Sequence, residues 1–429
     1  MISRKGTKDM RRQENYLYVG VDLHKETHTA VILNCWNEYV DEITFDNRPA
    51  EFPKVEKLVN KYCKKYSKEN DRGITYEPVY GLENAYGYGR SLALYLVEHQ
   101  YIVKDVNPAL SHLQRKSAPQ FKKNDSYDAQ CVATILINLL DELPDAKQAD
   151  DYWTLAQLVN RRENIVIELT RLKNQLHEQL VHAYPRYKDF FTVIDRPTAL
   201  YFWGTYPSPK CLAGVTPEQL AEELRPISHN QCSINRAKKI LEVIASDGQT
   251  LRDYQEERDF VTKNLVRVLE FQNKELVAIE KEIERMLIRF ECKLTSISGV
   301  DIVMAAKLLA EIGDINRFPN PDRLASFAGI APVKFSSAGK GKEKSSKQGN
   351  RRLHGIFYVL ALQMIQTARG SGIPRNPMFY EYYQRKITEG KTKPQAIICI
   401  MRRLVNIIYG MLKTKTEYRM SEVSKDKAI

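Results

Sequence analysis

The sequence predicts a mixed α/β domain at the N-terminus, followed by long helices and a mostly helical C-terminal domain. Strand and helix signals alternate over the first 130 residues. From about Asp151 the chain becomes rich in Leu, Glu, Lys and Gln and contains few Gly or Pro, which favours long helices. At about 150 residues per domain, a chain of 429 residues corresponds to two or three domains. Because 43% of the residues are hydrophobic, packed cores are expected, and a disordered or fibrous protein is excluded.

The N-terminal elements are short apolar runs that alternate with helical patterns. Runs rich in Val, Ile and Tyr predict strands, and three of these runs come first, the third at hairpin distance from the second. Strands are expected at 16–23, 28–34, 39–45, 78–84 and 101–106, and helices at 52–66, 88–99 and 125–142. Three strands followed by this alternation indicate a mixed sheet covered by helices.

Two apolar seams mark the middle of the chain. Residues at intervals of three and four form each seam: Leu169, Leu172, Leu176 and Leu180 in the first, and Leu276, Ile279, Ile283 and Met286 in the second. Such seams predict two long helices that pair, as an antiparallel pair or a coiled coil. The segment between them, 184–250, is interrupted by Pro and is expected to form a small irregular or helical insertion.

A third unit begins near Leu294, where two apolar stretches with helical spacing flank Gly299. This arrangement suits a helix-hairpin-helix, whose turn amides can bind a phosphate. A loop is expected at 336–352, which holds four Ser, three Gly and six Lys or Arg among seventeen residues. Apolar helices follow on both sides of a linker at 370–377.

Positive charge is concentrated in this last part of the chain. Lys and Arg total 65 against 53 Asp and Glu, which gives a net charge of +12. Residues 331–420 hold 18 Lys or Arg and 4 Asp or Glu, so they carry +14 and the remainder carries −2. A basic module of this kind is typical of a nucleic-acid-binding protein.

The cysteines and the N-terminus indicate the compartment. Seven cysteines are widely scattered without a C-x-x-C pair, so we expect reduced thiols that pack in the interior. The basic N-terminus lacks the apolar region of a secretory signal, and no run of about 18 apolar residues occurs. A soluble, cytoplasmic protein without a membrane partner is therefore expected.

Four acidic residues of the N-terminal domain are candidate metal ligands. Asp22 and Glu83 end predicted strands, whereas Asp125 and Asp128 stand three apart at a helix start and so share one face. Carboxylates placed in this way suit Mg²⁺, and two such ions can bind the attacking and leaving oxygens of a phosphodiester. The alternative is that each is a solvated turn residue or a cap, as Asp125 would be in KKND. For Asp22 this alternative is weaker, because a buried strand end is a costly place for an unused charge.

The sequence HKETH, at 24–28, raises the question of a zinc site. It is not H-E-x-x-H, it lies in a predicted hairpin turn, and it has no obvious third ligand. His24 and His28 are therefore expected to be solvated turn residues.

The loop that begins SSAGKGK, at 336–342, offers a nucleophile. A serine hydroxyl attacks poorly unless a base, a metal or a concentrated positive field stabilises its alkoxide. Small neighbours let a phosphate approach the backbone, and Lys340, Lys342, Lys344 and Lys347 could neutralise it. The alternative is a solvated loop that only grips phosphates. Other basic residues expected to contact phosphate are Lys122, Lys123, Arg351, Arg352, Lys391 and Lys393.

Several motifs together resemble a known family. They are VGVDLHKETHTAVIL, GLENAYGYGRSLALYL, VNPAL followed by KNDSYDA, and the stretch from ISGVD to SSAGKGK followed by KQGNRRL. In this order they resemble the DEDD insertion-sequence transposases of the IS-one-ten and IS-eleven-eleven type, which are relatives of the Piv DNA invertases. The resemblance covers most of the chain.

The resemblance implies a RuvC-like RNase H fold, a DNA transposase or recombinase activity, and specific site residues. The implied Mg²⁺ ligands are Asp22, Glu83, Asp125 and Asp128, and the implied nucleophile is Ser337. Family members are taken to form a phosphoserine link with DNA, with the serine domain of one subunit completing the acidic site of another. Two residues depart from the family pattern: Asn124 replaces a usual Thr, and Ala338 stands where Gly is common. Ser336 therefore remains an alternative nucleophile.

The resemblance also implies partners. A structured bridge RNA from the element would pair with donor and target DNA and select both. A homodimer that pairs into a homotetramer is expected, in a prokaryotic cytoplasm and associated with the nucleoid, with the long helices serving dimerisation and RNA binding. The expected domains are a basic tail at 1–14, a RuvC-like domain at 15–148, a coiled-coil region at 149–292 with its insertion, a C-terminal transposase domain at 293–420 and a tail at 421–429.

Two other functions are compatible with the residues. One is a metal-dependent junction nuclease that hydrolyses DNA without a covalent adduct. The other is a non-catalytic nucleic-acid-binding relic, although the four acids and the serine are all retained. An actin-like ATPase would require Gly-rich phosphate loops, which HKETHT does not supply.

Overall fold

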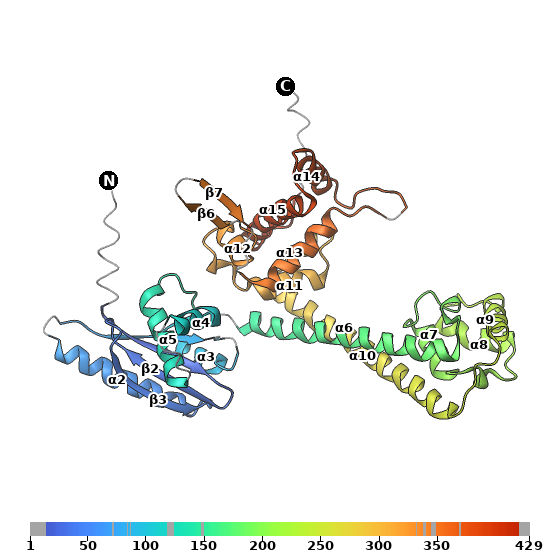
Figure 1. The fold of residues 1–429 in the computed structure, drawn as a ribbon, viewed down its shortest axis with the longest axis horizontal. Helices are drawn as coiled ribbons and strands as arrows, with labels where there is room; N and C mark the ends of the chain where they lie inside the picture. Colours follow the sequence, from blue (N-terminus) through green and yellow to red (C-terminus); the bar gives the residue numbers. More distant parts are fainter. Residues whose placement is uncertain are drawn as a thin grey trace, which may run out of the picture. The chain divides into compact units, whose positions relative to one another are not determined.

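The computed structural model describes residues 14–70, 73–83, 85, 87–117, 124–146, 150–331, 333–337, 340–344, 349–368 and 370–419. The chain divides into two compact units, Met1–Ala149 and Asp150–Ile429 (Figure 1). The predicted tails at 1–14 and 421–429 lie almost entirely outside the described residues.

A five-stranded sheet forms the centre of the N-terminal unit. Its strands are β1 (Tyr16–Leu23), β2 (Thr27–Leu33), β3 (Tyr39–Asp46), β4 (Glu77–Glu83) and β5 (Ile102–Val106). They lie in the order β3-β2-β1-β4-β5, with β2 antiparallel to β1 and β3, and with β4 parallel to β1 and β5. This is the predicted mixed sheet, and its order is consistent with an RNase H-like fold.

Helices cover both faces of this sheet (Figure 1). The predicted helices are α2 (Phe52–Glu69), α3 (Arg90–Glu98) and α5 (Asp125–Leu139). Apolar residues of α2 and α3 pack with Val19 and Val21 of β1, whereas α5 packs with Tyr18 on the other face. This division follows from the alternation of side chains along a strand.

A further helix, α4 (Pro108–Lys116), was not predicted. It begins with a cap at Asn107, whose side chain accepts a hydrogen bond from the Ala109 amide, and Pro108 occupies the first helical turn. Only Ser111 is buried along this helix. The helix lacks the apolar repeat that marks the other helices, so only the start signal in VNPAL indicates it.

Gly20 is the point of closest approach between β1 and α5. A Cβ at this position would lie 2.1 Å from the Ala129 carbonyl oxygen and 2.3 Å from the Ala133 amide nitrogen. Both atoms belong to the helix backbone, so a side chain cannot be accommodated by a rotamer change. Glycine therefore sets the distance between the strand that carries Asp22 and the helix that carries Asp128.

We expect Gly20→Ala to destabilise the protein by about 1–3 kcal/mol, because the added methyl group pushes α5 away from the sheet. Denaturant unfolding measures the change. Gly410→Ala is the matched control: a Cβ there meets no atom within 4 Å, and alanine in a helix is favoured over glycine by up to about 1 kcal/mol. Equal stability of the Gly20→Ala variant and the wild type would contradict the close packing.

Two long helices run side by side in the second unit: α6 (Asp150–Ala183) and α10 (Gln255–Arg289) (Figure 1). The predicted seams lie in or beside their contact: Leu176 and Leu180 of α6 and Ile283 of α10 are fully buried. The Arg162 guanidinium also joins the pair through the Glu280 carboxylate, at 2.8 Å. The predicted pairing of the long helices is confirmed, whereas a coiled-coil supercoil stays a prediction.

The insertion between the long helices is helical and has its own core with them. It consists of η1 (Tyr187–Asp189), α7 (Pro197–Thr205), η2 (Pro209–Leu212), α8 (Pro217–Ile227) and α9 (Ile234–Asp247). Buried aromatic side chains fill its centre, with the rings of Phe190 and Trp203 stacked 5.7 Å apart. Of the two predicted alternatives, the helical one is confirmed.

The C-terminal part packs around a second core of the same unit. Its elements are η3 (Leu294–Ser296), α11 (Ile302–Ile312), η4 (Ile315–Arg317), α12 (Pro321–Phe327), β6 (Val333–Ser337), β7 (Lys340–Lys344), α13 (Arg351–Met364), α14 (Pro377–Thr388) and α15 (Lys393–Thr414). The predicted helix-hairpin-helix is not confirmed, because a single 3-10 turn, η3, precedes Gly299 where a helix was expected.

The predicted loop at 336–352 is wrong in part. β6 and β7 form an antiparallel hairpin in which Ser337 is paired with Lys340. Lys and Gly have low strand propensity, so the sequence carries no strand signal here. The two strands of the hairpin pair through their backbones, and this pairing needs no particular side chain.

Among the described residues, one helix, α15, is long and apolar enough to cross a membrane by length and composition. It contacts α12, α13 and α14, and it buries Ile400, Leu404 and Ile408 against them. These contacts are those of a core helix. Phe379 of α14 is also fully buried, and Tyr382 and Tyr383 pack in part against the same core.

Candidate functional site

The four predicted acids lie at one end of the N-terminal sheet, where Asp22 and Asp125 have ligand atoms within 4.8 Å of each other and Glu83 and Asp128 lie outside that group. Asp22 is the penultimate residue of β1, and Glu83 is the last residue of the neighbouring parallel strand β4. Asp125 and Asp128 lie in the first turn of α5, which packs on β1. The charges of Asp125 and Asp128 act on Asp22, and those of Asp22 and Asp128 act on Glu83. The site therefore combines two strand ends with one helix start.

Burial and mutual repulsion shape the electrostatics of these acids. Burial raises the pKa of Asp22, and the carboxylates of Asp128 and Asp125 raise it further, whereas His24 opposes the change. Burial likewise raises the pKa of Glu83, and Asp22 adds to this effect, whereas Arg115 opposes it. Clustered buried carboxylates are costly unless a positive charge joins them.

Three carboxylate oxygens in this cluster are buried without a hydrogen-bond partner among the described residues: Oδ2 of Asp22, which only forms an ion-pair contact with His24, Oδ1 of Asp128 and Oε2 of Glu83. Buried polar atoms are almost always paired, so an unpaired oxygen indicates that another group binds there. Carboxylate oxygens are the ligands that Mg²⁺ prefers. The donor set therefore fits a divalent cation.

His24 joins this cluster, which the sequence did not indicate. Its Nε2 atom lies 3.0 Å from Asp22 Oδ2 and 3.5 Å from Asp125 Oδ1, and the ligand atoms of the three residues lie within 4.8 Å of one another. The expectation of a solvated turn holds for its exposure, since the side chain is 54% exposed. It is wrong for His28, which is fully buried on β2 with its ring edge-on to Phe45.

The capping interpretation of Asp125 is also wrong. Asn124 is the cap of α5, and its side chain accepts a hydrogen bond from the Tyr127 amide. Asp125 lies one residue later, inside the first turn, with 59% of its side chain exposed. Its carboxylate is therefore available to the cluster.

Arg115 is a site residue that sequence reasoning missed. Its guanidinium lies 2.9 Å from Asp128 Oδ2, and 18% of the side chain is exposed. It comes from α4, the helix without an apolar repeat, which contacts α5. The sequence signal for this helix is its Asn-Pro start. The contact between Arg115 and Asp128 joins residues of different elements, so it leaves no local signal in the sequence.

The predicted nucleophile lies on the basic hairpin of the second unit. Ser336 and Ser337 end β6, and their backbone partners in β7 are Gly341 and Lys340. Lys342 and Lys344 belong to β7 as well. The predicted contacts at Lys347, Lys122 and Lys123 lie outside the described residues.

The chain is anchored tightly just after this hairpin. Gly349 has φ of +108°, and a Cβ there would lie 2.8 Å from the Phe327 carbonyl oxygen. The Asn350 amide donates a hydrogen bond of 2.7 Å to that same oxygen. The side-chain amide of Asn350 donates to Glu311 at 2.8 Å, and its oxygen caps α13. Glycine is therefore required for the backbone conformation and for the close approach.

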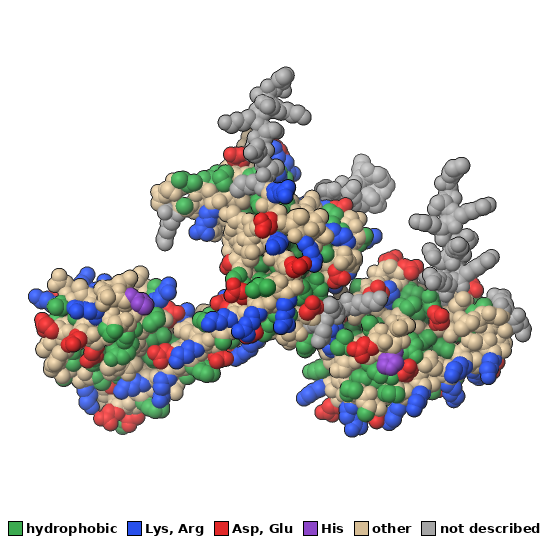
Figure 2. All heavy atoms as spheres, turned by 180° about the vertical axis from the view of Figure 1, so that it is seen from behind, with side chains coloured by type: hydrophobic (Ala, Val, Ile, Leu, Met, Phe, Trp, Pro, Cys, Tyr) green, Lys and Arg blue, Asp and Glu red, His purple; other side chains and the backbone are tan. Residues whose placement is uncertain are grey.

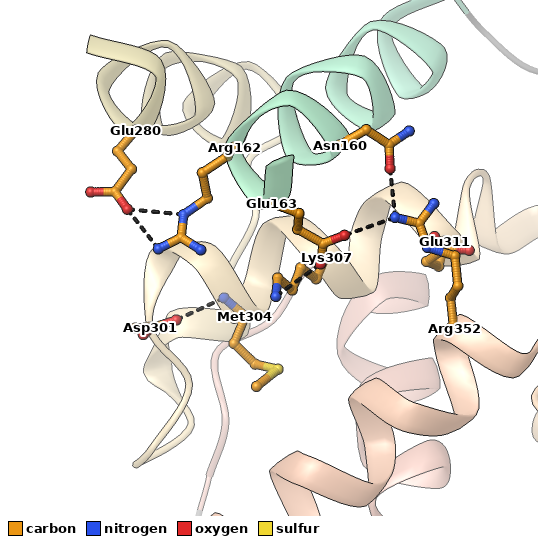
Figure 3. Close-up of polar contacts among 9 residues, drawn as sticks. All are labelled: Asn160, Arg162, Glu163, Glu280, Asp301, Met304, Lys307, Glu311 and Arg352. Carbon is orange, nitrogen blue, oxygen red and sulfur yellow. Dashed lines mark hydrogen bonds and ion pairs between the residues drawn. The ribbon is translucent and has the colours of Figure 1, made fainter. Parts of the chain in front are cut away.

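Arg352 completes this anchor (Figure 3). Its guanidinium donates to Asn160 Oδ1 at 2.6 Å and to Glu163 Oε2 at 2.8 Å, and it pairs with Glu311 at 3.4 Å. Glu163 also binds Lys307, at 3.0 Å. Arg352 ties α13 to α6 and α11, and its predicted contact with nucleic acid stays a prediction, since 53% of the side chain is exposed. Arg351, Lys391 and Lys393 are exposed, so phosphate contacts at these residues stay predictions.

Comparison with known proteins agrees with both parts of this description. A model of the IS116/IS110/IS902 family of transposases matches residues 292–384, which include Ser337. A second transposase model, for the DEDD type of IS110, matches residues 19–185, which include the four acids.

Individual relatives match longer or shorter parts of the chain. The chain is 27% identical to the uncharacterized 43.6 kDa protein of insertion element IS110 from Streptomyces coelicolor, over 70% of this chain and 73% of the relative. It is 26% identical to the uncharacterized 44.8 kDa protein of insertion element IS116 from Streptomyces clavuligerus, over 68% of this chain and 72% of the relative. A pilin gene-inverting protein of Moraxella bovis is 32% identical over 28% of this chain and 36% of its own length. With an acidic cluster at one end of a mixed sheet and both family regions in order, the chain belongs to the IS116/IS110/IS902 family of transposases.

Proposed function

We propose that this transposase cuts and rejoins donor and target DNA through a phosphoserine intermediate formed by Ser337. Membership of a DEDD transposase family implies DNA substrates and a divalent metal. The observation that carries the proposal is the cluster of four acids at one sheet end, with buried oxygens of Asp128 and Glu83 that have no partner among the described residues. Such a cluster is suited to phosphoryl transfer.

Each acid has a role in this proposal. Asp22, Glu83, Asp125 and Asp128 would hold Mg²⁺, which when bound neutralises phosphate charge and polarises the phosphorus–oxygen bonds. Arg115 pairs with Asp128 and so fixes one of its oxygens while the other faces the cluster. His24, bound between Asp22 and Asp125, orients both carboxylates. These contacts hold the ligands ready before DNA arrives.

The serine step exchanges one phosphoester for another. The Ser337 oxygen attacks the phosphorus, an oxygen–phosphorus bond to serine forms, and the bond from phosphorus to the sugar oxygen of the cut strand breaks. The hydroxyl proton leaves the serine, and the released sugar oxygen gains a proton. Rejoining is the reverse reaction with a sugar hydroxyl of another strand. Because the number of phosphoester bonds is conserved, no energy-rich cofactor is required. The lysines of β7 can neutralise the phosphate.

A structured RNA of the element is proposed to select the DNA sites. Sequence choice by base pairing needs a protein that holds backbones through charge and shape, and the +14 module at 331–420 is suited to that task. We propose that the protein works as a homodimer that pairs into a homotetramer. The similarity to a protein named for pilin gene inversion supports a reaction that rejoins DNA as well as cutting it.

A complementation experiment tests whether the serine of one subunit serves the acids of another. Ser337→Ala and Asp22→Asn are each expected to be inactive alone. In a mixed dimer, the serine of the Asp22→Asn subunit can serve the intact acids of the Ser337→Ala subunit. When the two variants are mixed, about a quarter to a half of the wild-type recombination should therefore return. Unmixed variants are the controls. If mixing restores nothing although mixed dimers form, both groups act from the same subunit.

A further inference from the structure

We propose that the exposed face of α2 is a second DNA-binding surface, which contacts the phosphate backbone of duplex DNA beside the cleavage site. This lysine face consists of Lys54, Lys57, Lys61, Lys64, Lys65 and Lys68. It lies in the N-terminal unit, outside the basic module at 331–420 that the charge distribution points to. The proposal uses the DNA substrate of the family and does not depend on the serine chemistry.

All six lysines are exposed, and they share one side of the helix. At about 100° per residue, they fall within an arc of about 100°. The buried residues Phe52, Val55, Val59 and Cys63 lie on the opposite side, where they pack on the sheet. Figure 2 shows Lys and Arg side chains in a row along the edge of this unit where Figure 1 places α2.

These charges are compensated only in part. Lys54 pairs with Glu51, whereas the other five lysines have no ion pair with a described residue. Glu56 and Glu69 also border the face, so six lysines and three carboxylates leave a net charge of +3. Lysines three and four residues apart repel one another, by roughly 0.2–0.5 kcal/mol for each pair. An ordinary solvated helix face mixes both signs, so this pattern fits a polyanionic partner.

The first turn of α2, which carries Lys54, lies at the same end of the sheet as the acids. β3 runs parallel to β1, and α2 follows β3, so α2 begins at the sheet end where Asp22 and Glu83 lie. Asn47, in the connection, confirms this position, because its side chain donates to the Lys25 carbonyl oxygen at 3.2 Å and to that of Tyr88 at 3.1 Å. The helix then runs away from the acids, on the sheet face opposite to α5.

The length of the lysine face sets the length of DNA it can contact. Lys54 and Lys68 are 14 residues apart, which corresponds to about 21 Å along a helix. This distance equals about six base pairs of a duplex. An open groove of about 770 Å³ follows the same face, lined by Lys57, Lys61, Lys64 and Lys68 among others. A duplex bound along this face would run away from the acids. The lysines would therefore contact phosphates other than the one that is cleaved.

The test is the salt dependence of DNA binding by the full-length protein. The probe is a 30-base-pair duplex of random sequence, a length of about 100 Å, and fluorescence anisotropy gives the affinity at several salt concentrations. Loss of four phosphate contacts in the variant Lys57→Ala/Lys61→Ala/Lys64→Ala/Lys68→Ala should reduce the slope of log affinity against log salt by about 3.6. The control removes four exposed lysines elsewhere: Lys238, Lys239, Lys263 and Lys281. Its slope should stay within about 1 of the wild type.

Equal reductions in both variants would overturn the proposal, because they would reflect net charge alone. An unchanged slope in the α2 variant would overturn it as well. A photo-crosslinking residue at position 61 should attach to the duplex, whereas crosslinking to RNA alone would assign the lysine face to RNA and contradict the proposal. Circular dichroism of the α2 variant checks that the helix persists. Adduct formation through Ser337 is measured separately, so failure here leaves the proposed reaction untouched.

Discussion

Ser337→Ala is expected to abolish the covalent protein–DNA adduct, with binding of RNA unchanged. The reason is chemical: the variant keeps the basic hairpin and loses only the oxygen that would form the phosphoester. End-labelled DNA carrying the element junctions is incubated with protein, the RNA of the element and Mg²⁺, and a denaturing gel then separates free DNA from DNA bound covalently to protein. We expect loss of the shifted band to below about one thousandth of the wild type, as for other removed nucleophiles.

Ser336→Ala is the matched control, because the two serines are neighbours at the end of β6. It should retain the adduct. Adducts that persist in Ser337→Ala and disappear in Ser336→Ala would assign the nucleophile to Ser336. The same gel tests the rival function: a metal-dependent junction nuclease cuts DNA in the wild type and leaves no protein on the ends.

Asp22→Asn and Asp128→Asn are each expected to remove Mg²⁺-dependent recombination, by a factor of about 100 to 1,000. Both changes keep the size of the side chain and remove one negative charge from the proposed metal site. Recombination between donor and target plasmids measures the activity. Binding of Mn²⁺, followed by calorimetry, measures the loss of the metal site directly, without reference to catalysis.

Unfolding does not explain such a loss in Asp22→Asn, and the pKa of Asp22 shows why. Burial and the neighbouring carboxylates raise this pKa, so ionised Asp22 disfavours the folded state without metal as pH rises above the ordinary value of a carboxyl. Asp22→Asn relieves this cost, and the metal-free variant should be at least as stable as the wild type at pH 7. Asp141→Asn, an exposed acid of the same unit, is the control and should recombine normally. Wild-type rates in Asp22→Asn or Asp128→Asn would contradict the metal site.

Much of the fold could be predicted because local signals and burial agree. The apolar runs of the sheet strands are also the runs that become buried, as for β1, where seven of eight residues are buried. The seams of α6 and α10 show the same agreement, since the spacing that predicts the helix also predicts its packed side. Prediction failed where the local signal is weak: α4 buries one residue, and β7 of the serine hairpin is made of Lys, Gly and Glu, which disfavour strands.

The residues of the candidate site also include some that could be predicted from the sequence and some that could not. Carboxylates at strand ends and at a helix start could be identified from spacing, and the parallel pairing of β1 with β4 brings Asp22 and Glu83 to one edge. The roles of Arg115 and Arg352 could not be predicted. Each guanidinium is defined by a partner on another element, Asp128 in one case and Asn160, Glu163 and Glu311 in the other. A single basic residue in a sequence carries no record of such a partner.

The sequence by itself determined most of the element types, the acids and the basic module, because these depend on local periodicity, residue chemistry and charge. The tertiary structure alone decided which groups meet: His24 with Asp22 and Asp125, Arg115 with Asp128, and Arg352 with α6 and α11. It also decided which face of the sheet α2 covers, and so on which side of the unit its lysines are exposed. The physical reason is that hydrogen bonds and ion pairs act over a few ångströms in space, whereas their partners here lie up to 192 positions apart in the chain.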